Sequence, residues 1–140
     1  MRFDKLTVKS QEAIARAQSI ARERQHQGIG PAHLLAALLE QKDGVVAPVL
    51  EKLGVLPASV AREVAAALEK APKVYGQEPG QYLTTPAANV LEDASSEAER
   101  LKDEYVSTEH ILLALAGSED DTGKLLRSMG IKKDDIYKAL

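Results

Sequence analysis

The chain has no cysteine, and aromatic residues make up only 4% of its 140 residues. Without cysteine there is no disulfide framework, no zinc–thiolate site and no thiol nucleophile, and nothing marks the chain for an oxidising compartment. The default expectation for such a sequence is an intracellular, cytoplasmic protein.

A basic excess is also missing, since 18 Lys and Arg stand against 21 Asp and Glu and give a formal net charge of −3. Proteins that bind DNA or RNA mostly rely on such an excess, so a nucleic-acid partner is not expected. No apolar stretch approaches the roughly 20 residues that cross a bilayer, and the N-terminus mixes charges into every turn. We therefore expect neither a signal peptide nor a membrane partner.

What the chain does contain is a composition suited to a folded core, with 44% apolar and 28% charged residues. These shares match ordinary globular usage, and 140 residues suit one ordinary domain or two very small ones that pack together. The two halves differ in charge. Residues 1–70 hold ten basic and eight acidic groups, a net +2, whereas residues 71–140 hold eight and thirteen, a net −5.

An internal repeat organises the chain. An offset of 77 positions aligns residues 6–39 with residues 83–116 without a gap, and nine of the 34 positions are identical. After a one-residue deletion the offset becomes 76, which places Gly54 on Gly130 and Val60 on Ile136. Repeats of this kind bury their apolar faces against each other.

The repeat predicts a single domain over residues 1–140. Its first repeat covers about residues 6–70 and its second repeat covers residues 83–140. Between them, residues 71–82 contain two Pro and two Gly and form the only credible linker.

Apolar residues recur every three and four positions in both repeats, which is typical of amphipathic helices. No segment shows the alternation of a strand. The expected fold is therefore all-α, with eight helices arranged as two four-helix repeats related by pseudo-two-fold symmetry. Thr7 and Thr85 are the predicted N-caps of the first helix of each repeat. The segment from Ile111 to Leu115 is apolar on every side and is expected at the centre of the core.

A search for catalytic and metal-binding motifs finds none. The tract from Gly117 to Lys124 has five residues between its glycines, carries three acids and lacks the Ser or Thr that would bind magnesium, so it does not fit a phosphate-binding loop. His33 and His110 are equivalent in the repeat, and each follows a predicted helix start. No zinc motif or activated serine accompanies them, so we expect them to hydrogen-bond the local backbone.

Three polar residues lie at predicted helix ends, where side chains border grooves rather than cores. They are Thr7, Asp103 and Glu109. Each also has an ordinary explanation, because Thr7 can cap its helix, Asp103 can be a surface charge and Glu109 can complement the helix dipole.

Several tracts together resemble the N-terminal domain of ClpB-type Clp/Hsp100 AAA+ chaperones, over essentially the whole chain. The tracts are MRFDKLTVKSQEAIARAQ, GIGPAHLLAALL, LTTPAANVLEDA and DEYVSTEHILLAL. The resemblance implies a non-enzymatic module that binds unfolded or aggregated polypeptides for a protein disaggregase. The parent protein would be a homohexameric ATPase that uses ATP and magnesium and works with a DnaK-type chaperone, whereas this chain would need no cofactor.

The resemblance also implies a substrate site, in a groove with an apolar floor and an acidic rim. By position its polar residues are Thr7, Asp103 and Glu109, and its apolar residues are Leu91 and Ile111.

Two alternatives to substrate binding stay open. Related ClpC and ClpA proteins dock protease adaptors through the same fold. In ClpC proteins both repeats also carry an acid before the histidine and read phosphorylated arginine, but Ala32 stands at that place in the first repeat. A paired phosphoarginine site is therefore not expected. The other alternative is a stand-alone hydrolase that uses His33 or His110.

Overall fold

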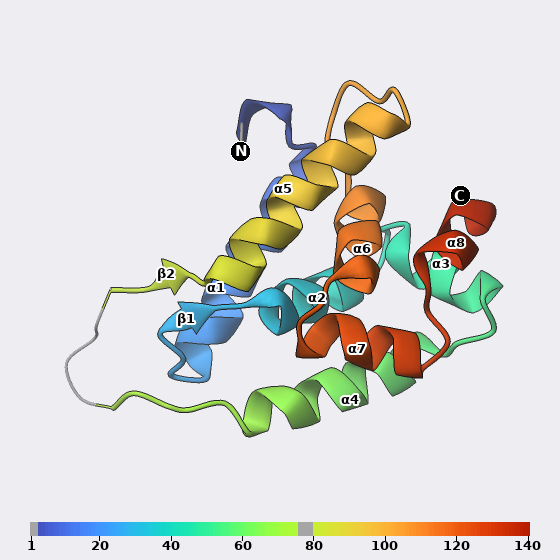
Figure 1. Cartoon of the computed structure of the whole chain (residues 1–140). Helices are drawn as coiled ribbons and strands as arrows, with labels where there is room; N and C mark the ends of the chain where they lie inside the picture. Colours follow the sequence, from blue (N-terminus) through green and yellow to red (C-terminus); the bar gives the residue numbers. More distant parts are fainter. Residues whose placement is uncertain (1–2, 76–79) are drawn as a thin grey trace.

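The computed structural model of the chain describes residues 3–75 and 80–140. Within these ranges the chain forms eight α-helices, one short 3-10 helix at Phe3–Lys5 and two strands of two residues each (Figure 1). The first four helices are α1 (Val8–Glu23), α2 (Pro31–Glu40), α3 (Val46–Lys52) and α4 (Pro57–Glu69), and the last four are α5 (Thr85–Arg100), α6 (Thr108–Gly117), α7 (Asp121–Ser128) and α8 (Lys133–Ala139). The strands are β1 (Gly28–Ile29) and β2 (Tyr82–Leu83). The prediction of an all-α fold with eight helices is confirmed.

Helices α1–α4 and α5–α8 are two copies of one arrangement. Both α1 and α5 have 16 residues, and both α2 and α6 have ten. The turns before α4 and α8 each contain a glycine with a positive φ, 77° at Gly54 and 83° at Gly130. Glycine adopts this conformation at no steric cost, which explains why both repeats keep it there. Of the expected linker, residues 76–79 lie outside the described residues and Tyr82 belongs to β2.

Two short parallel pairings join the repeats. In one, Ile29 of β1 lies opposite Leu83 of β2, and in the other Leu6 forms a bridge with Val106. Offset by 77, Leu6 becomes Leu83 and Ile29 becomes Val106, so the two pairings are copies of each other. The segment that enters each repeat thus pairs with the loop after the first helix of the other repeat. Sequence reasoning missed these strands because two residues are too few to show an alternating pattern.

Side chains and backbone close the helix ends in the same way in both repeats. The Thr7 hydroxyl oxygen accepts a hydrogen bond from the Ser10 amide at 3.1 Å and caps α1. The Thr84 hydroxyl oxygen accepts one from the Ala87 amide at 3.2 Å and caps α5. The prediction that Thr85 is this cap is wrong by one residue. Thr85 is the first residue of α5, and the repeat offset matches Thr7 to Thr84.

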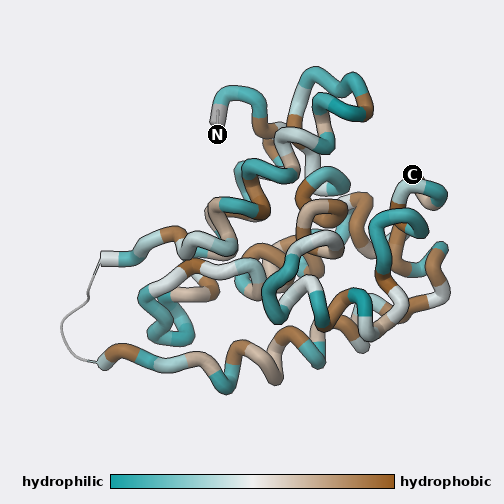
Figure 2. The backbone as a smooth tube through the Cα atoms, viewed as in Figure 1, coloured by the Kyte–Doolittle hydropathy of each residue, from teal (hydrophilic) through white to brown (hydrophobic). Residues whose placement is uncertain are grey.

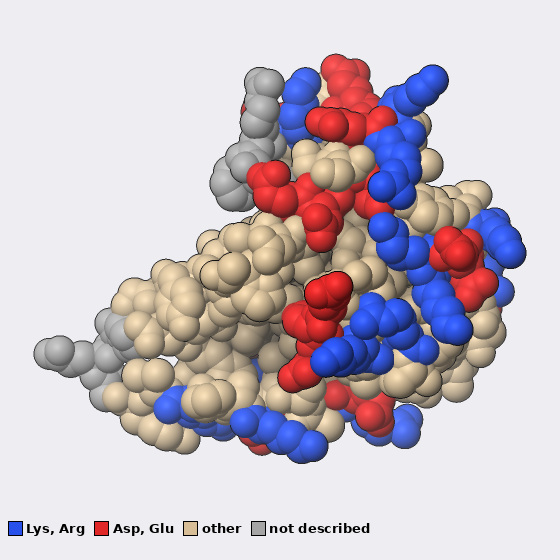
Figure 3. Space-filling model, in the orientation of Figure 1, with Lys and Arg blue, Asp and Glu red and all other residues tan. Residues whose placement is uncertain are grey.

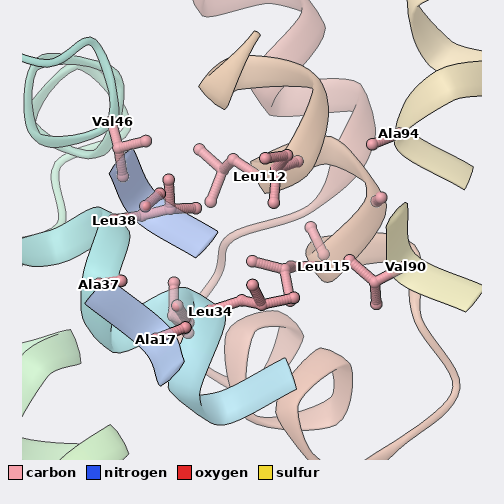
Figure 4. Close-up of a cluster of buried hydrophobic side chains, with 14 of the residues drawn as sticks. Ala17, Leu34, Ala37, Leu38, Val46, Val90, Ala94, Leu112 and Leu115 are labelled. Carbon is pink, nitrogen blue, oxygen red and sulfur yellow. The ribbon is translucent and has the colours of Figure 1, made fainter. Parts of the chain in front are cut away.

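The hydrophobic core lies where α2 and α6 meet between the outer helices. In α6, every residue from His110 to Ala116 is at most 3% exposed, which confirms the prediction that this segment is central. Figure 4 shows Leu34 and Leu38 of α2 pointing toward Leu112 and Leu115 of α6. The outer helices instead alternate hydrophilic and hydrophobic residues along the tube in Figure 2. One core therefore serves both repeats.

Candidate functional site

Thr7 lies where the N-terminal segment meets the loop between α5 and α6. Its amide donates a hydrogen bond to the Val106 carbonyl at 3.1 Å. The Ser10 hydroxyl donates to the same carbonyl at 2.9 Å, and the Thr7 hydroxyl donates to the Ser10 hydroxyl oxygen at 3.0 Å. Thr7 is half-buried. This network holds the start of α1 against the α5–α6 loop, which is about a hundred residues further along the chain.

Asp103 is positioned by the end of α5. Lys102 takes a left-handed conformation with a φ of 60°, and the Asp103 amide turns back to donate to the Ala98 carbonyl at 2.8 Å. This is the Schellman arrangement of a helix C-terminus. The Asp103 side chain is half exposed, and its Oδ2 lies 2.8 Å from Nε2 of His110. The carboxylate therefore has one oxygen tied to the protein and lies at the surface.

His110 orients Asp103. Its Nδ1 accepts a hydrogen bond from the Ser107 amide at 2.9 Å, so in the neutral ring the proton is on Nε2, which donates to Asp103. The ring is 1% exposed and closes the capping box of α6. The prediction that His110 bonds the local backbone is confirmed, and the arrangement offers no free imidazole for catalysis.

Glu109 lies in the first turn of α6, next to His110, and is half-buried. A carboxylate at this position is stabilised by the positive end of the helix dipole. Val106 binds Thr7 and His110 binds Asp103, so the α5–α6 loop and the start of α6 connect these two predicted residues, and Glu109 lies between Val106 and His110 in the chain. Sequence spacing alone does not reveal this arrangement, since Thr7 belongs to the other repeat.

The apolar part of the predicted site is wrong. Leu91 is 2% exposed and Ile111 is 0% exposed, so both belong to the core and neither lines a surface groove. Their apolar character follows from packing between α5 and α6. The helical pattern identifies the buried stripe of a helix, but it does not separate core positions from groove positions.

An open hollow lies beside α1, adjacent to Thr7. Its volume is about 480 Å³, and its apolar wall is formed by Leu6, Ile14 and Ala15. Asp4, Gln11 and Gln18 supply the polar rim. Since Leu6 also forms the bridge with Val106, the hollow borders the join between the repeats. We refer to it below as the seam hollow.

The first repeat carries a different version of the aspartate–histidine pair. His33 Nδ1 accepts from the Gly30 amide at 2.9 Å, and His33 Nε2 lies 2.9 Å from Nδ1 of His26. His26 thus occupies the place of Asp103, as the offset of 77 requires. Burial first, and then the charges of His26 and Arg24, lower the pKa of His33 to about 4. Burial lowers the pKa of His26 as well. This pair is therefore neutral at neutral pH.

Sequence reasoning did not single out His26. The signal was available, because the repeat offset places His26 on Asp103 and His33 on His110. Among the described residues, no group of three or more His, Cys, Asp or Glu side chains is arranged to hold a metal ion. Nor does any helix in the described ranges have the length and apolarity to cross a membrane.

The tract from Gly117 to Lys124 does not fit ATP or its magnesium. The Asp120 carboxylate accepts from the Gly123 amide at 3.2 Å and caps α7, so this amide is not free to bind a phosphate. Gly123 also packs against the Ser118 carbonyl, where an added Cβ would lie only 1.9 Å away. Acidic side chains also gather over α5 and its following loop on the face shown in Figure 3.

Comparison with known proteins gives a consistent family. Residues 5–129 match the model of the Clp repeat (R) N-terminal domain. The chaperone protein ClpB of Bacillus cereus is 36% identical over 143 aligned residues, which cover 100% of this chain and 16% of that protein. The chain thus spans about a sixth of the length of such relatives.

Solved structures show the same fold. The Hsp104 N-terminal domain from Candida albicans superposes with a TM-score of 0.83 at 24% identity, covering 96% of this chain and 88% of that one. A ClpV N-domain in complex with a VipB peptide has a TM-score of 0.73 at 22% identity, covering 97% and 89% of the two chains.

Proposed function

The chain belongs to the Clp N-terminal domain family, of the kind found in ClpB and Hsp104 chaperones, and on that premise we propose that it binds unfolded or aggregated polypeptide. The site is the edge formed by Thr7, Asp103 and Glu109 together with the seam hollow. The chain itself is a binding module, without a catalytic or ATPase role.

The observation that carries this proposal is the convergence of polar and apolar groups at the join of the two repeats. The Leu6–Val106 bridge places the seam hollow, which Leu6 lines, next to Thr7 and the α5–α6 loop. His110 holds the Asp103 carboxylate at the surface. A receptor for many unfolded sequences needs open apolar contacts and a few fixed polar anchors rather than an enclosed pocket.

Charge supports a preference among substrates. Asp103, Glu104 and Glu109 lie within the α5–α6 loop and the first turn of α6, and residues 71–140 carry a net charge of −5. Such a rim favours polypeptide segments that combine basic and apolar residues. The peptide bound to the related ClpV N-domain supports the idea that this fold can hold a polypeptide segment.

In a full-length protein of the ClpB type, the module would pass its polypeptide to an ATPase ring. This part of the proposal includes a cytoplasmic homohexamer that uses ATP and magnesium and cooperates with a DnaK-type chaperone. The resemblance to ClpB-type chaperones implies each of these features, and the chain spans 16% of the length of such a relative.

An amide-resolved NMR titration of this chain with a permanently unfolded polypeptide tests the site. Contacts with dissociation constants from micromolar to millimolar, about 4–8 kcal/mol, remain visible in this experiment. We expect shifts around Thr7, Ile14, Asp103 and Glu109. The Asp103→Asn variant should bind several-fold more weakly, because it removes the charge and keeps an oxygen for His110.

The repeat supplies a matched control for Thr7. Both Thr7→Ala and Thr84→Ala remove a helix N-cap and cost stability of the same order, about 1 kcal/mol. Only Thr7→Ala should weaken polypeptide binding. Equal effects of the two variants, or no shifts at saturating polypeptide, would contradict the site. Tight binding of one folded protein without any response to unfolded chains would favour adaptor docking instead.

A further inference from the structure

A second hollow lies within the first repeat, between α1, α2 and α4, away from the edge proposed above. Its volume is about 250 Å³ and its wall is mostly apolar, with Ile20, Ala36, Leu39, Ala61 and Ala65 among the lining residues. We refer to it as the α1–α4 pocket. Arg24, which is one of its lining residues, forms an ion pair with Glu69 of α4 at a distance of 3.0 Å.

The second repeat fills the same space with one of its own side chains. At the offset of 76, Ala61 of α4 corresponds to Tyr137 of α8. The Tyr137 hydroxyl donates a hydrogen bond to the Glu97 carboxylate and accepts one from Arg100 at 3.4 Å, so its ring spans the gap between α8 and α5. Glu97 and Arg100 correspond to Ile20 and Glu23, which both line the α1–α4 pocket. The α1–α4 pocket therefore lies at the position in the first repeat that corresponds to the one filled by the Tyr137 side chain in the second.

The size of the pocket fits one aromatic side chain. An apolar cavity of about 150 Å³ already takes a benzene molecule. Whole small-molecule ligands usually occupy about 300–1,000 Å³. At about 250 Å³, the α1–α4 pocket lies between these values.

The charges at the rim exclude an ionic ligand as the main occupant. Arg16 pairs with Glu40 at 2.7 Å and with Glu23 at 2.9 Å, so its guanidinium is already neutralised. Arg24 is paired with Glu69. An apolar wall under a rim of paired charges suits a neutral ring, over which a guanidinium can also stack.

From this internal comparison we propose that the α1–α4 pocket binds a tyrosine or phenylalanine side chain of a polypeptide substrate, in the position that Tyr137 occupies in the second repeat. The inference rests on the proposed function, since it takes polypeptide to be the ligand. It adds a second contact point with a defined side-chain preference.

The test uses two synthetic peptides of ten residues, one with a single central tyrosine and one with alanine in its place. In an NMR titration of the chain, the tyrosine peptide should shift the amides of Ala36, Leu39, Ala61 and Ala65. The alanine peptide should bind at least tenfold more weakly at these amides. Equal shifts with both peptides would overturn the proposal.

Variants on α4 give the matched control. Ala61→Tyr places in the first repeat the side chain that the second repeat has, and it should abolish binding of the tyrosine peptide in the pocket. Ala58→Tyr adds the same side chain at another exposed position of α4 and should leave binding unchanged. Ala61→Met serves as a second blocking variant if Ala61→Tyr disturbs the amide spectrum. Undiminished binding to a folded blocking variant would overturn the proposal.

Two further outcomes separate this inference from its premise. If unfolded polypeptide shifts the Thr7 edge but the tyrosine peptide never shifts the pocket, only the present inference fails. If neither ligand shifts any amide, the proposed function fails with it. Concentration-dependent shifts of the pocket amides without any peptide would identify a second copy of the chain as the occupant and would overturn the choice of partner.

Discussion

At the scale of single residues, the two equivalent histidines differ in the partner that each one meets. His110 bonds a half-exposed carboxylate, whereas His33 bonds the buried His26, which is 4% exposed. Protonating both rings of the histidine pair would place two charges side by side in a region of low dielectric constant. The first repeat therefore contains a histidine pair that resists protonation.

The histidine pair predicts a loss of stability on acidification. Because the folded pKa of His33 is about 4 and the ordinary value is about 6.5, the unfolded chain binds more protons between these two pH values. The stabilisation is present above about pH 6.5 and is lost as the pH falls toward 4, by up to about 3 kcal/mol. Urea unfolding at several pH values measures it. A His33→Gln variant should lose less stability over this range than the parent chain.

A single substitution should give the first repeat the aspartate–histidine pair that the second repeat has. His26→Asp gives His33 a carboxylate partner and removes the neighbouring imidazole that opposes its protonation. The pKa of His33 should then rise well above 4, as followed by NMR of its ring protons. A pKa that stays near 4 would show that burial alone sets it.

Glu97 is a buried carboxylate, at 3% exposed. Burial raises its pKa, but hydrogen bonds from Lys133 and Tyr137 outweigh burial and leave the pKa below the usual value. Glu97→Ala should lower the free energy of unfolding by about 2–4 kcal/mol, because it leaves Lys133 and Tyr137 without their partner and opens a cavity. Glu97→Ile places here the residue that the first repeat has, Ile20. In urea unfolding it should cost less than the alanine variant.

At the scale of helices, the ends of α1 and α5 share an unusual conformation. Gln25 and Lys102 have φ angles of 62° and 60°, although neither is a glycine. This left-handed conformation costs residues with a side chain about 1–2 kcal/mol. Gln25→Gly and Lys102→Gly should each raise the free energy of unfolding by about 0.5–1 kcal/mol, after the entropy of glycine is counted. Val at either position should lower it, and thermal unfolding distinguishes the two directions.

The helices were the part of the fold that the sequence predicts well. Apolar residues recur at helical spacing in both repeats, and the repeat offset supports the helices of one repeat with a second copy in the other. The N-cap of α5 and the apolar groove residues are predicted less well, because several neighbouring residues satisfy the same sequence rule. Thr84 and Thr85 both satisfy the rule for an N-cap, and the apolar periodicity that marks Leu91 and Ile111 does not show which side of a helix another helix covers. Asp103 and Glu109 could be selected, but the link between the α5–α6 loop and Thr7 depends on a contact between the repeats.

At the scale of the whole molecule, the two repeats fold around one core. The structure has α2 of the first repeat in contact with both α5 and α6 of the second, and α3 in contact with α6 and α8. We expect a single cooperative unfolding transition that is the same by circular dichroism and by fluorescence of the tyrosines. Leu112→Ala, in the shared core, should cost about 2–5 kcal/mol and lower the stability of both repeats together in hydrogen exchange.

The shared core also predicts how the halves behave when they are separated. A fragment of residues 1–75 should be largely unfolded alone, since its Leu6 and α2 lose their partners. The same holds for a fragment of residues 76–140. Mixing the two should restore helical circular dichroism in a concentration-dependent way. A stably folded single fragment would contradict the shared core.

The crossed pairings of Leu6 with Val106 and of Ile29 with Leu83 have a consequence for the origin of the fold. Two separate chains, each with one repeat, could form a symmetric dimer that has both pairings. In this dimer the segment that enters each repeat would pair with the loop after the first helix of the other chain. Fusion of two gene copies would then need no new contact, only a tether from α4 to β2. With that tether, the two repeats would associate within a single chain, and their association would no longer depend on protein concentration. After such a fusion each copy would be free to diverge, and the pair Ala61 and Tyr137 is one position at which the two repeats differ.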